Sequence, residues 1–315
     1  MRGRHLLGVL LLPSLLSACS LPRGGYDSAY RVVHGWPTLP EGFALGQVPG
    51  VGVDSHDHVL VFHRGDRPIL RLDSQSGEIL ASWGDGLFDV PHGLAVDSED
   101  NVWVTDQSIH QVFKFNHEGE LLMTLGERGV GAWDETHFNE PTDVAVTPSG
   151  TVYVADGHKN QRVVKFSKEG KFLLEWGGKG EAPGEFAEPH GLGLDAEGRV
   201  YVADRQASRI QVFDENGKFL HQWESEELGR PWGLEIGPEG FLYVVDGGDF
   251  KEEPPDRNRA LKLDLHGNIL AKWGSFGKYD GQFYWAHDVA VSKTGAVYVS
   301  DVNVGMRVQK FIPRQ

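Results

Sequence analysis

The chain repeats one pattern of apolar and polar positions six times. In one copy, apolar residues alternate with polar ones over 93–97, 101–106, 111–115 and 120–126. These runs are rich in β-branched and aromatic residues, and turn pairs such as Ser-Gly, Glu-Gly and Asn-Gly separate such runs along the chain. Alternation with period two between turn residues predicts four short antiparallel strands in every copy, and no helical period extends past the first residues.

The spacing of the copies predicts a closed ring. Their first residues stand at 49, 91, 141, 189, 231 and 286. Repeats of about 40–50 residues with four strands each are typical of β-propeller blades. We therefore expect an all-β, six-bladed β-propeller over residues 30–315. The sixth copy ends after its third strand, at 307–311, and residues 30–36 resemble a fourth strand. We expect this N-terminal strand to close the last blade and to remove an open sheet edge.

The first 29 residues do not follow the repeat. Residues 1–18 carry Arg2, Arg4 and then an apolar run over 6–16, which is the layout of a signal peptide and too short for a spanning helix. The run ends at Cys19 and resembles a bacterial lipoprotein signal. We expect lipidation at Cys19, a tether over 19–29, and an exported protein anchored by its lipid to the cell envelope, at the outer membrane where there are two membranes. An ordinary cleaved signal is the alternative.

Charge and cysteine content exclude several classes of function. The net charge is −15, which argues against nucleic acid as a partner and against electrostatic attraction to anionic lipid. Cys19 is the one cysteine in the chain, so the propeller contains no disulfide, thiol ligand or thiol nucleophile.

A histidine recurs at the opening of every second copy. His92, His190 and His287 hold this position, and the intervening copies open without histidine. In a six-bladed ring, alternate blades point at one axis, so the three imidazoles converge at one mouth of the channel. Three nitrogen ligands with an open fourth position are typical of catalytic zinc. Separately hydrogen-bonded structural histidines are the alternative.

The loops after the second strands face the same mouth. Five of them carry an aspartate, which we interpret as a turn device of the repeat: Asp106, Asp156, Asp204, Asp246 and Asp301. The exceptions are more informative. Arg64 and Arg205 share one register beside the expected metal, where two guanidinium groups suit a substrate that bears a carboxylate. Surface salt bridges are the alternative. His158 lies on the corresponding loop of the third copy, and Asp288 follows a candidate ligand.

The motifs resemble one family of NHL-repeat proteins, the peptidyl-α-hydroxyglycine α-amidating lyases (peptidylamidoglycolate lyases). The matching stretches are 61–66, 91–94, 104–106 with 110–114, 137–146, 202–205 with 209–211, and 287–289. The resemblance implies zinc on the three histidines at positions 92, 190 and 287. It also implies a structural calcium on Asp288 and on the carbonyls of Val51 and Leu94, and it places the substrate-site arginines at Arg64 and Arg205. One departure is marked, because His158 stands where the family has its proposed catalytic tyrosine, and Lys159 stands at a disulfide cysteine.

These observations give one leading hypothesis and two alternatives. The leading hypothesis is a monomeric zinc lyase that splits a carboxylate-bearing N-acyl hemiaminal, such as a peptidyl-α-hydroxyglycine, into an amide and glyoxylate. Arg64 would orient the carboxylate, His158 would be the base, and Arg205 would position the substrate or the base. The alternatives are a metal-dependent hydrolase that uses the same three histidines and a lipid-anchored, non-catalytic propeller that binds a protein, peptide or glycan. The insertion over 246–259 is interpreted as a surface loop.

Overall fold

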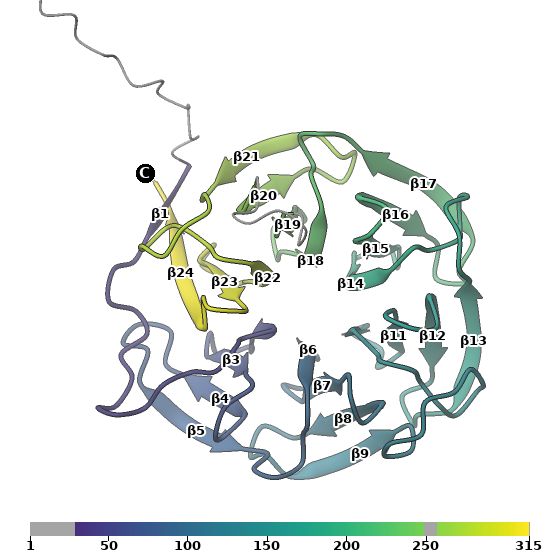
Figure 1. Ribbon diagram of the computed structural model, residues 1–315, viewed down its shortest axis with the longest axis horizontal. Helices are drawn as coiled ribbons and strands as arrows, with labels where there is room; N and C mark the ends of the chain where they lie inside the picture. Colours follow the sequence, from purple (N-terminus) through teal and green to yellow (C-terminus); the bar gives the residue numbers. More distant parts are fainter. Residues whose placement is uncertain (1–28, 249–256, 315) are drawn as a thin grey trace, which may run out of the picture.

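Twenty-four strands form six four-stranded antiparallel sheets arranged around a central axis, as the computed structural model shows for residues 29–248 and 257–314 (Figure 1). Blade one contains β2 (Gly50–Val53), β3 (Val59–Phe62), β4 (Ile69–Leu72) and β5 (Ile79–Trp83). Blade two contains β6 (Pro91–Val96), β7 (Val102–Asp106), β8 (Gln111–Phe115) and β9 (Leu121–Leu125). Blade three contains β10 (Asp143–Val146), β11 (Val152–Asp156), β12 (Arg162–Phe166) and β13 (Phe172–Gly177).

The remaining blades follow the same order. Blade four contains β14 (Pro189–Leu194), β15 (Val200–Asp204), β16 (Arg209–Phe213) and β17 (Phe219–Glu224). Blade five contains β18 (Pro231–Ile236), β19 (Leu242–Asp246), β20 (Arg259–Leu263) and β21 (Ile269–Trp273). Blade six contains β22 (Ala286–Val291), β23 (Val297–Asp301), β24 (Arg307–Pro313) and β1 (Tyr30–Val32). The six-bladed propeller predicted from the repeat is thus confirmed.

The N-terminal strand closes the ring, as the sequence predicts. β1 pairs antiparallel with β24, with Tyr30 opposite Pro313 and Val32 opposite Phe311. Figure 1 shows the purple and yellow ends of the chain side by side in this sheet. The insertion of blade five falls between β19 and β20, as expected, and its central part lies outside the described residues. The leader, Cys19 and the tether also lie outside them, so those interpretations stay predictions. No helix in 29–248 or 257–314 is long and apolar enough to cross a membrane.

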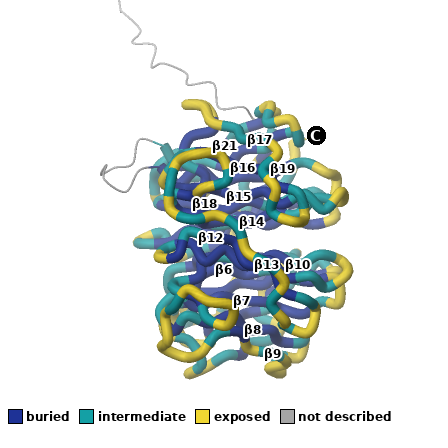
Figure 2. The backbone as a smooth tube through the Cα atoms, turned by 90° about the vertical axis from the view of Figure 1, so that its right-hand side faces the viewer, coloured by how far each residue is buried: buried dark blue, intermediate teal, exposed yellow. Residues whose placement is uncertain are grey.

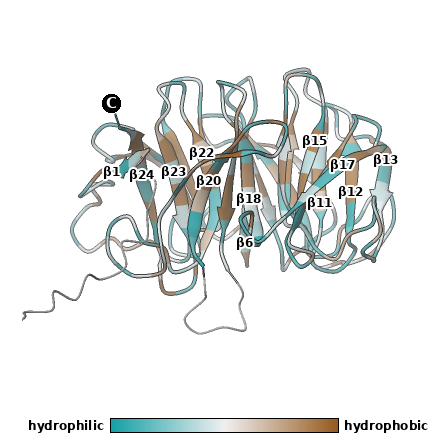
Figure 3. Cartoon of the chain, turned by 90° about the horizontal axis from the view of Figure 1, so that it is seen from above, coloured by the Kyte–Doolittle hydropathy of each residue, from teal (hydrophilic) through white to brown (hydrophobic). Residues whose placement is uncertain are grey.

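The core lies between the blades. Each of six buried hydrophobic clusters joins two neighbouring sheets; Leu60 and Phe62 of blade one, for example, pack with Val104 and Phe113 of blade two. Figure 2 shows the buried segments inside the ring and the exposed ones on its loops and rim. Figure 3 shows strands that run between two faces, with loops at both. A sheet buried on both sides keeps its position only when both neighbours are present, so the ring is one cooperative unit.

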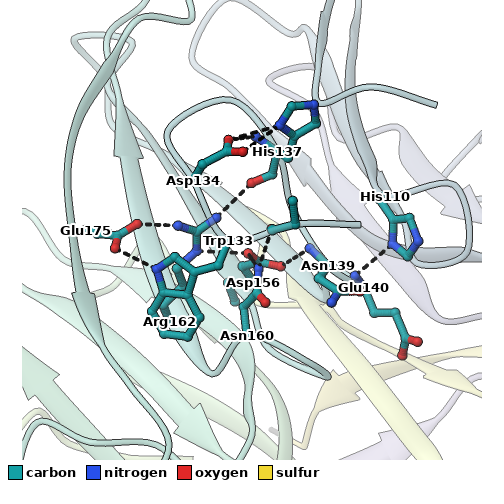
Figure 4. Close-up of polar contacts among 12 residues, drawn as sticks. His110, Trp133, Asp134, His137, Asn139, Glu140, Asp156, Asn160, Arg162 and Glu175 are labelled. Atoms are coloured by element: carbon teal, nitrogen blue, oxygen red, sulfur yellow. Dashed lines mark hydrogen bonds and ion pairs between the residues drawn. The ribbon is translucent and has the colours of Figure 1, made fainter. Parts of the chain in front are cut away.

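The repeated aspartates hold the loops at the histidine end of the blades. Asp156 accepts a hydrogen bond from the backbone N–H of Asn139 (2.7 Å) and from the side chain of Arg162 (3.0 Å), and Arg162 also contacts Glu175 (Figure 4). Asp204 accepts the backbone N–H of Glu188 at 2.8 Å. In blade one, where the aspartate is absent, His63 Nδ1 accepts the N–H of Gly46 at 3.1 Å instead. The aspartates are therefore structural groups, as the sequence analysis interpreted them.

We expect Asp106→Ala to lower the free energy of unfolding by about 3 kcal/mol, because it removes a buried carboxylate that accepts hydrogen bonds from several backbone donors. These donors are the N–H groups of Asp89, Val90, Ser108 and Ile109. Urea unfolding followed by circular dichroism measures the loss. The control is Glu181→Ala, which removes an exposed carboxylate. Equal stability of the two variants would show that the aspartate does not hold the loop.

Candidate metal centre

Local irregularities in the inner strands turn the three histidines toward the axis. The pairing of β6 with β7 shifts register between Pro91 and Leu94, an interval that contains His92. The same shift brackets His190 in β14 and His287 in β22. A β-bulge leaves a residue outside the ladder and redirects its side chain. Each histidine is therefore presented to the channel by a distortion of its own strand.

Glycine beside the histidine allows the inner strands to approach closely. A Cβ atom on Gly93 would lie 2.5 Å from Asp143 Oδ1, and one on Gly191 would lie 2.8 Å from the carbonyl oxygen of Trp232. Any larger side chain would push neighbouring blades apart. With the strands this close, the imidazoles meet, and the ring centroids of His92, His190 and His287 lie 4.8–4.9 Å from one another.

Each imidazole donates a hydrogen bond to the following blade and turns its other nitrogen inward. The Nδ1 atoms lie 2.7–2.8 Å from backbone carbonyl oxygens; the pairs are His92 with Thr142, His190 with Trp232, and His287 with Pro49. A carbonyl oxygen only accepts, so Nδ1 carries the hydrogen and Nε2 carries a lone pair. The buried His190 Nε2 has no hydrogen-bond partner among the described residues.

Burial keeps these imidazoles neutral. Desolvation, followed by the positive charges of neighbouring groups, holds the pKa of all three histidines well below its usual value. Each histidine offers one nitrogen as a possible metal ligand, and these three atoms lie within 4.8 Å of one another. Neutral imidazoles whose Nδ1–H is bound by a carbonyl are the form in which histidine binds metals. The residues present therefore fit a metal ion, as the sequence analysis expected.

His158 is a fourth imidazole beside this triad. It stands on the loop after β11, and its Nε2 lies 3.2 Å from His92 Nε2. Its Nδ1 lies 2.6 Å from the carboxylate of Glu188. Burial opposes the charge on Glu188, but the hydrogen bond from His158 and the charge of Arg205 lower the pKa of Glu188 to about 2. Since Glu188 is then an acceptor, His158 Nδ1 carries the hydrogen. Two lone pairs at 3.2 Å repel each other unless a proton or a metal ion lies between them.

The two arginines of the site have different surroundings. Arg64 donates to neutral acceptors, the carbonyl oxygen of Pro91 at 3.0 Å and the amide oxygen of Gln47 at 2.8 Å. Arg205 makes an ion pair with Glu188, in which Nη2 lies 2.5 Å from Oε1, and its guanidinium packs 4.5 Å from the ring of Trp232. Burial lowers the pKa of both arginines. Both line the site as predicted, but only Arg205 faces a carboxylate of the protein at ion-pair distance among the described residues.

These groups line one cavity at the histidine mouth of the channel. It has a volume of about 320 Å³. It brings together Arg64, His92, His158, Arg205 and His287, all of which the sequence singled out. Residues that the sequence analysis did not identify also line it or support it: Gln47, Gln107, Glu188, Trp232, Trp285, Val302 and Asn303. Glu188 precedes the Pro-His pair of blade four, but blade three also has a glutamate, Glu140, at this position, so the repeat alone did not single out Glu188.

A second set of polar groups lies deeper in the channel. Val51, Leu94 and Asp288, which the resemblance implies for calcium, line one cavity of about 170 Å³. Asp143 and Glu235, which the sequence analysis did not single out, line the same cavity. Burial raises the pKa of Asp288 to about 7. Burial, followed by the charge of Asp288, also raises the pKa of Asp143 and of Glu235 well above the usual value. Buried carboxylates in such a cluster favour a bound cation.

Comparisons with known proteins place this arrangement in a family. NHL repeats match residues 88–115, 138–166, 186–213 and 283–311. Peptidyl-alpha-hydroxyglycine alpha-amidating lyase 2 of Drosophila melanogaster is 30% identical, over 89% of this chain and 75% of its own length. NHL repeat-containing protein 3 of mouse is 34% identical, over 91% and 85%. Peptidyl-glycine alpha-amidating monooxygenase B of Xenopus laevis is 35% identical over 88% of this chain.

The shared lengths differ among these relatives. The chain spans about a third of the length of the amidating monooxygenases that it matches. Among solved structures, a streptogramin B lyase has a TM-score of 0.62 at 13% identity, over 87% of this chain and 95% of its own. A gluconolactonase from Xanthomonas campestris has a TM-score of 0.62 at 14% identity, over 92% and 96%. At such identity the structures support the propeller fold alone. The closer sequence relatives decide the family, and the chain belongs to the NHL-repeat family of the peptidyl-α-hydroxyglycine α-amidating lyases.

Proposed function

We propose that this protein is a zinc-dependent lyase that cleaves the C–N bond of a peptidyl-α-hydroxyglycine, or a similar carboxylate-bearing N-acyl hemiaminal, to an amide and glyoxylate. The observation that carries the proposal is the convergence of three neutral imidazoles, two of which, His92 and His287, line one cavity with Arg64 and His158. Membership of the family supports lyase chemistry. A scaffold that only binds a partner has no need for this combination of groups.

The donor set suits zinc. His92, His190 and His287 would hold the ion through three nitrogen atoms, and two of these residues line the cavity that would receive the substrate. Such three-histidine sites with one open position are typical of catalytic zinc. A bound zinc ion would act as a Lewis acid on the substrate hydroxyl and lower its pKa.

Arg64 is the group that would bind the substrate carboxylate. It lines the cavity and carries a positive charge that its neutral partners, Gln47 and the Pro91 carbonyl, do not cancel. A guanidinium offers two parallel donors to a carboxylate. Arg205 already forms an ion pair with Glu188, so its charge is less available to bind a substrate carboxylate. We therefore assign carboxylate binding to Arg64 and the support of neighbouring groups to Arg205.

His158 would move the proton. Its Nε2 points to the metal centre with a lone pair, as the hydrogen on Nδ1 is held by Glu188. The base takes the hydroxyl proton, the C–O bond becomes a carbonyl, and the C–N bond breaks with its electron pair on nitrogen. The nitrogen then takes a proton, which His158 can return, so the reaction needs no water or other reactant. Histidine replaces the tyrosine of the family in this role.

We also propose calcium in the channel. Asp288 and the carbonyl oxygens of Val51 and Leu94 belong to the cavity in which three carboxylates gather, and hard oxygen ligands are those that calcium prefers. A cation there would offset the cost of burying Asp288 as an anion. In this proposal calcium is structural, since the cavity lies below the histidines and away from Arg64 and His158.

We expect the purified protein to hold about one zinc per chain, and the double variant His92→Ala, His190→Ala to hold none, since two of three ligands are lost. Elemental analysis by mass spectrometry measures the metal. The control is His266→Ala, at a turn between β20 and β21. A folded wild-type protein that carries no transition metal and takes none up would contradict the lyase proposal and leave a binding propeller.

We expect Arg64→Ala to lower kcat/KM for glyoxylate release from benzoyl-α-hydroxyglycine by about 10- to 100-fold, because a charge-assisted pair contributes about 1.5–3 kcal/mol. The corresponding carboxamide substrate should react equally with wild type and variant, since it lacks the anion. Arg67→Ala, three residues along and exposed, is the matched control. An equal loss for both substrates would assign Arg64 another role.

We expect calcium to raise the melting temperature of the chelator-treated protein by several degrees, since about 100-fold excess over Kd adds about 2.7 kcal/mol to stability. Asp288→Asn should abolish most of this rise, because it removes the charged ligand. Differential scanning fluorimetry measures both, and Glu226→Gln, an exposed site, is the control. A rise that persists in Asp288→Asn would place the calcium elsewhere.

A further inference from the structure

Glu188 lies between the candidate base and an arginine. One carboxylate oxygen, Oε1, lies 2.6 Å from His158 Nδ1 and 2.5 Å from Arg205 Nη2. The other, Oε2, lies 3.3 Å from Arg205 Nε. Glu188 is 7% exposed and Arg205 is 5% exposed. Within the part of the chain that the structure describes, the polar contacts of this carboxylate are made to these two side chains, away from bulk water.

The carboxylate is fixed from several directions. The backbone N–H of Glu188 donates to Asp204 Oδ1 at 2.8 Å, and its carbonyl accepts the N–H of Arg205 at 2.9 Å. The guanidinium of Arg205 is itself held against the face of Trp232. Glu188 therefore has no freedom to follow His158 if that ring moves. Arg205 thus fixes the Glu188 carboxylate, and this carboxylate in turn fixes the His158 imidazole.

This contact determines which nitrogen of His158 is available to the cavity. A neutral imidazole carries its hydrogen on either nitrogen, and a hydrogen-bond partner at one of them selects the tautomer. With a carboxylate at Nδ1, the hydrogen stays there and Nε2 keeps the lone pair, 3.2 Å from His92 Nε2. In the other tautomer His158 would donate toward the metal centre and could not accept a proton.

We propose that Glu188 is a positioning residue of the active site, which holds His158 as the Nδ1–H tautomer with Nε2 directed at the metal centre. The role of His158 as base rests on the function proposed above, whereas its tautomer and orientation do not. Carboxylates that orient a functional imidazole in this way strengthen it as a base and as a ligand. Arg205 completes the arrangement, because its guanidinium donates to both carboxylate oxygens of Glu188 and holds them in place.

A purely structural role makes a different prediction. If Glu188 only neutralised the buried charge of Arg205, its loss would weaken folding without any specific effect on His158. A positioning role acts through the imidazole, so its effect must disappear when the imidazole is absent. The two roles are therefore separable by one measurement on His158 and one coupling measurement.

The first experiment observes the imidazole directly. Zinc-loaded protein labelled with ¹⁵N-histidine is compared by NMR with Glu188→Gln, and His158→Ala identifies the resonance. We expect wild type to show a strongly deshielded hydrogen on Nδ1 of His158, and Glu188→Gln to move it upfield, since the charged acceptor is lost. Glu140→Gln, at the same repeat position in blade three, should leave it unchanged. An Nε2–H tautomer in wild type, or an unmoved resonance in Glu188→Gln, would overturn the proposal.

The second experiment tests coupling through turnover. We expect Glu188→Ala to lower kcat on the order of 10- to 100-fold, while KM stays within about twofold and zinc content is unchanged. In the His158→Ala background the same substitution should have no further effect on kcat. A loss that persists there would mean that Glu188 acts independently of His158 and would overturn the proposal. If no lyase turnover is found at all, the proposed reaction fails while the NMR result still decides the role of Glu188.

Discussion

Hydrogen bonds between neighbouring blades link the metal centre to the closure of the ring. Each axial imidazole donates from Nδ1 to the carbonyl of the following blade, and the last of these bonds joins His287 to Pro49, from the sixth blade back to the first. At the same junction, β1 completes the sixth blade and the sixth sheet packs against the first. The direction of all three Nε2 lone pairs is therefore a property of the closed propeller. The site needs no dedicated domain, because the symmetry that stabilises the fold also aims its ligands.

The same symmetry explains what could be predicted from the sequence. In a ring of equal repeats, equivalent positions of the copies lie at regular angles around one axis. Histidines at the same position of alternate copies must therefore converge on that axis. The turn residues marked the boundaries of the strands, and the absence of a fourth strand from the sixth copy indicated that the N-terminal strand completes that blade. Gly93 and Gly191, which follow two of the histidines, lie where the inner strands approach closely, a feature that the sequence analysis did not predict.

Contacts that break the symmetry could not be predicted in the same way. Arg64 and Arg205 occupy one register and look equivalent in the sequence. They differ because the blade that carries Arg205 also places Glu188 beside it, whereas the hydrogen bonds of Arg64 go to an amide and a carbonyl oxygen. Such a difference depends on side-chain rotamers and on partners from another loop. Asp143 is a different case, since it stands at the same repeat position as Asp288 in the opposite blade, and the repeat itself contained the signal.

The distribution of charge along the channel gives a physical reason for the acidic groups. A divalent metal ion on three neutral imidazoles adds two positive charges to a buried cavity that already holds Arg64 and Arg205, and this concentration of charge is costly to bury. Glu188 cancels one guanidinium within the cavity. Asp143 and Asp288 directly follow the ligand layer and share a small cavity with His92, His190 and His287. With the calcium proposed above, these two carboxylates would face that ion, so Glu188 is the group that offsets charge beside the histidines. Among the described residues, the hydrogen bonds of Arg64 go to neutral acceptors, whereas Arg205 is paired with Glu188. In the proposed reaction, an anionic substrate group would be drawn to Arg64 and to the zinc, and His158, held by Glu188, would lie beside them.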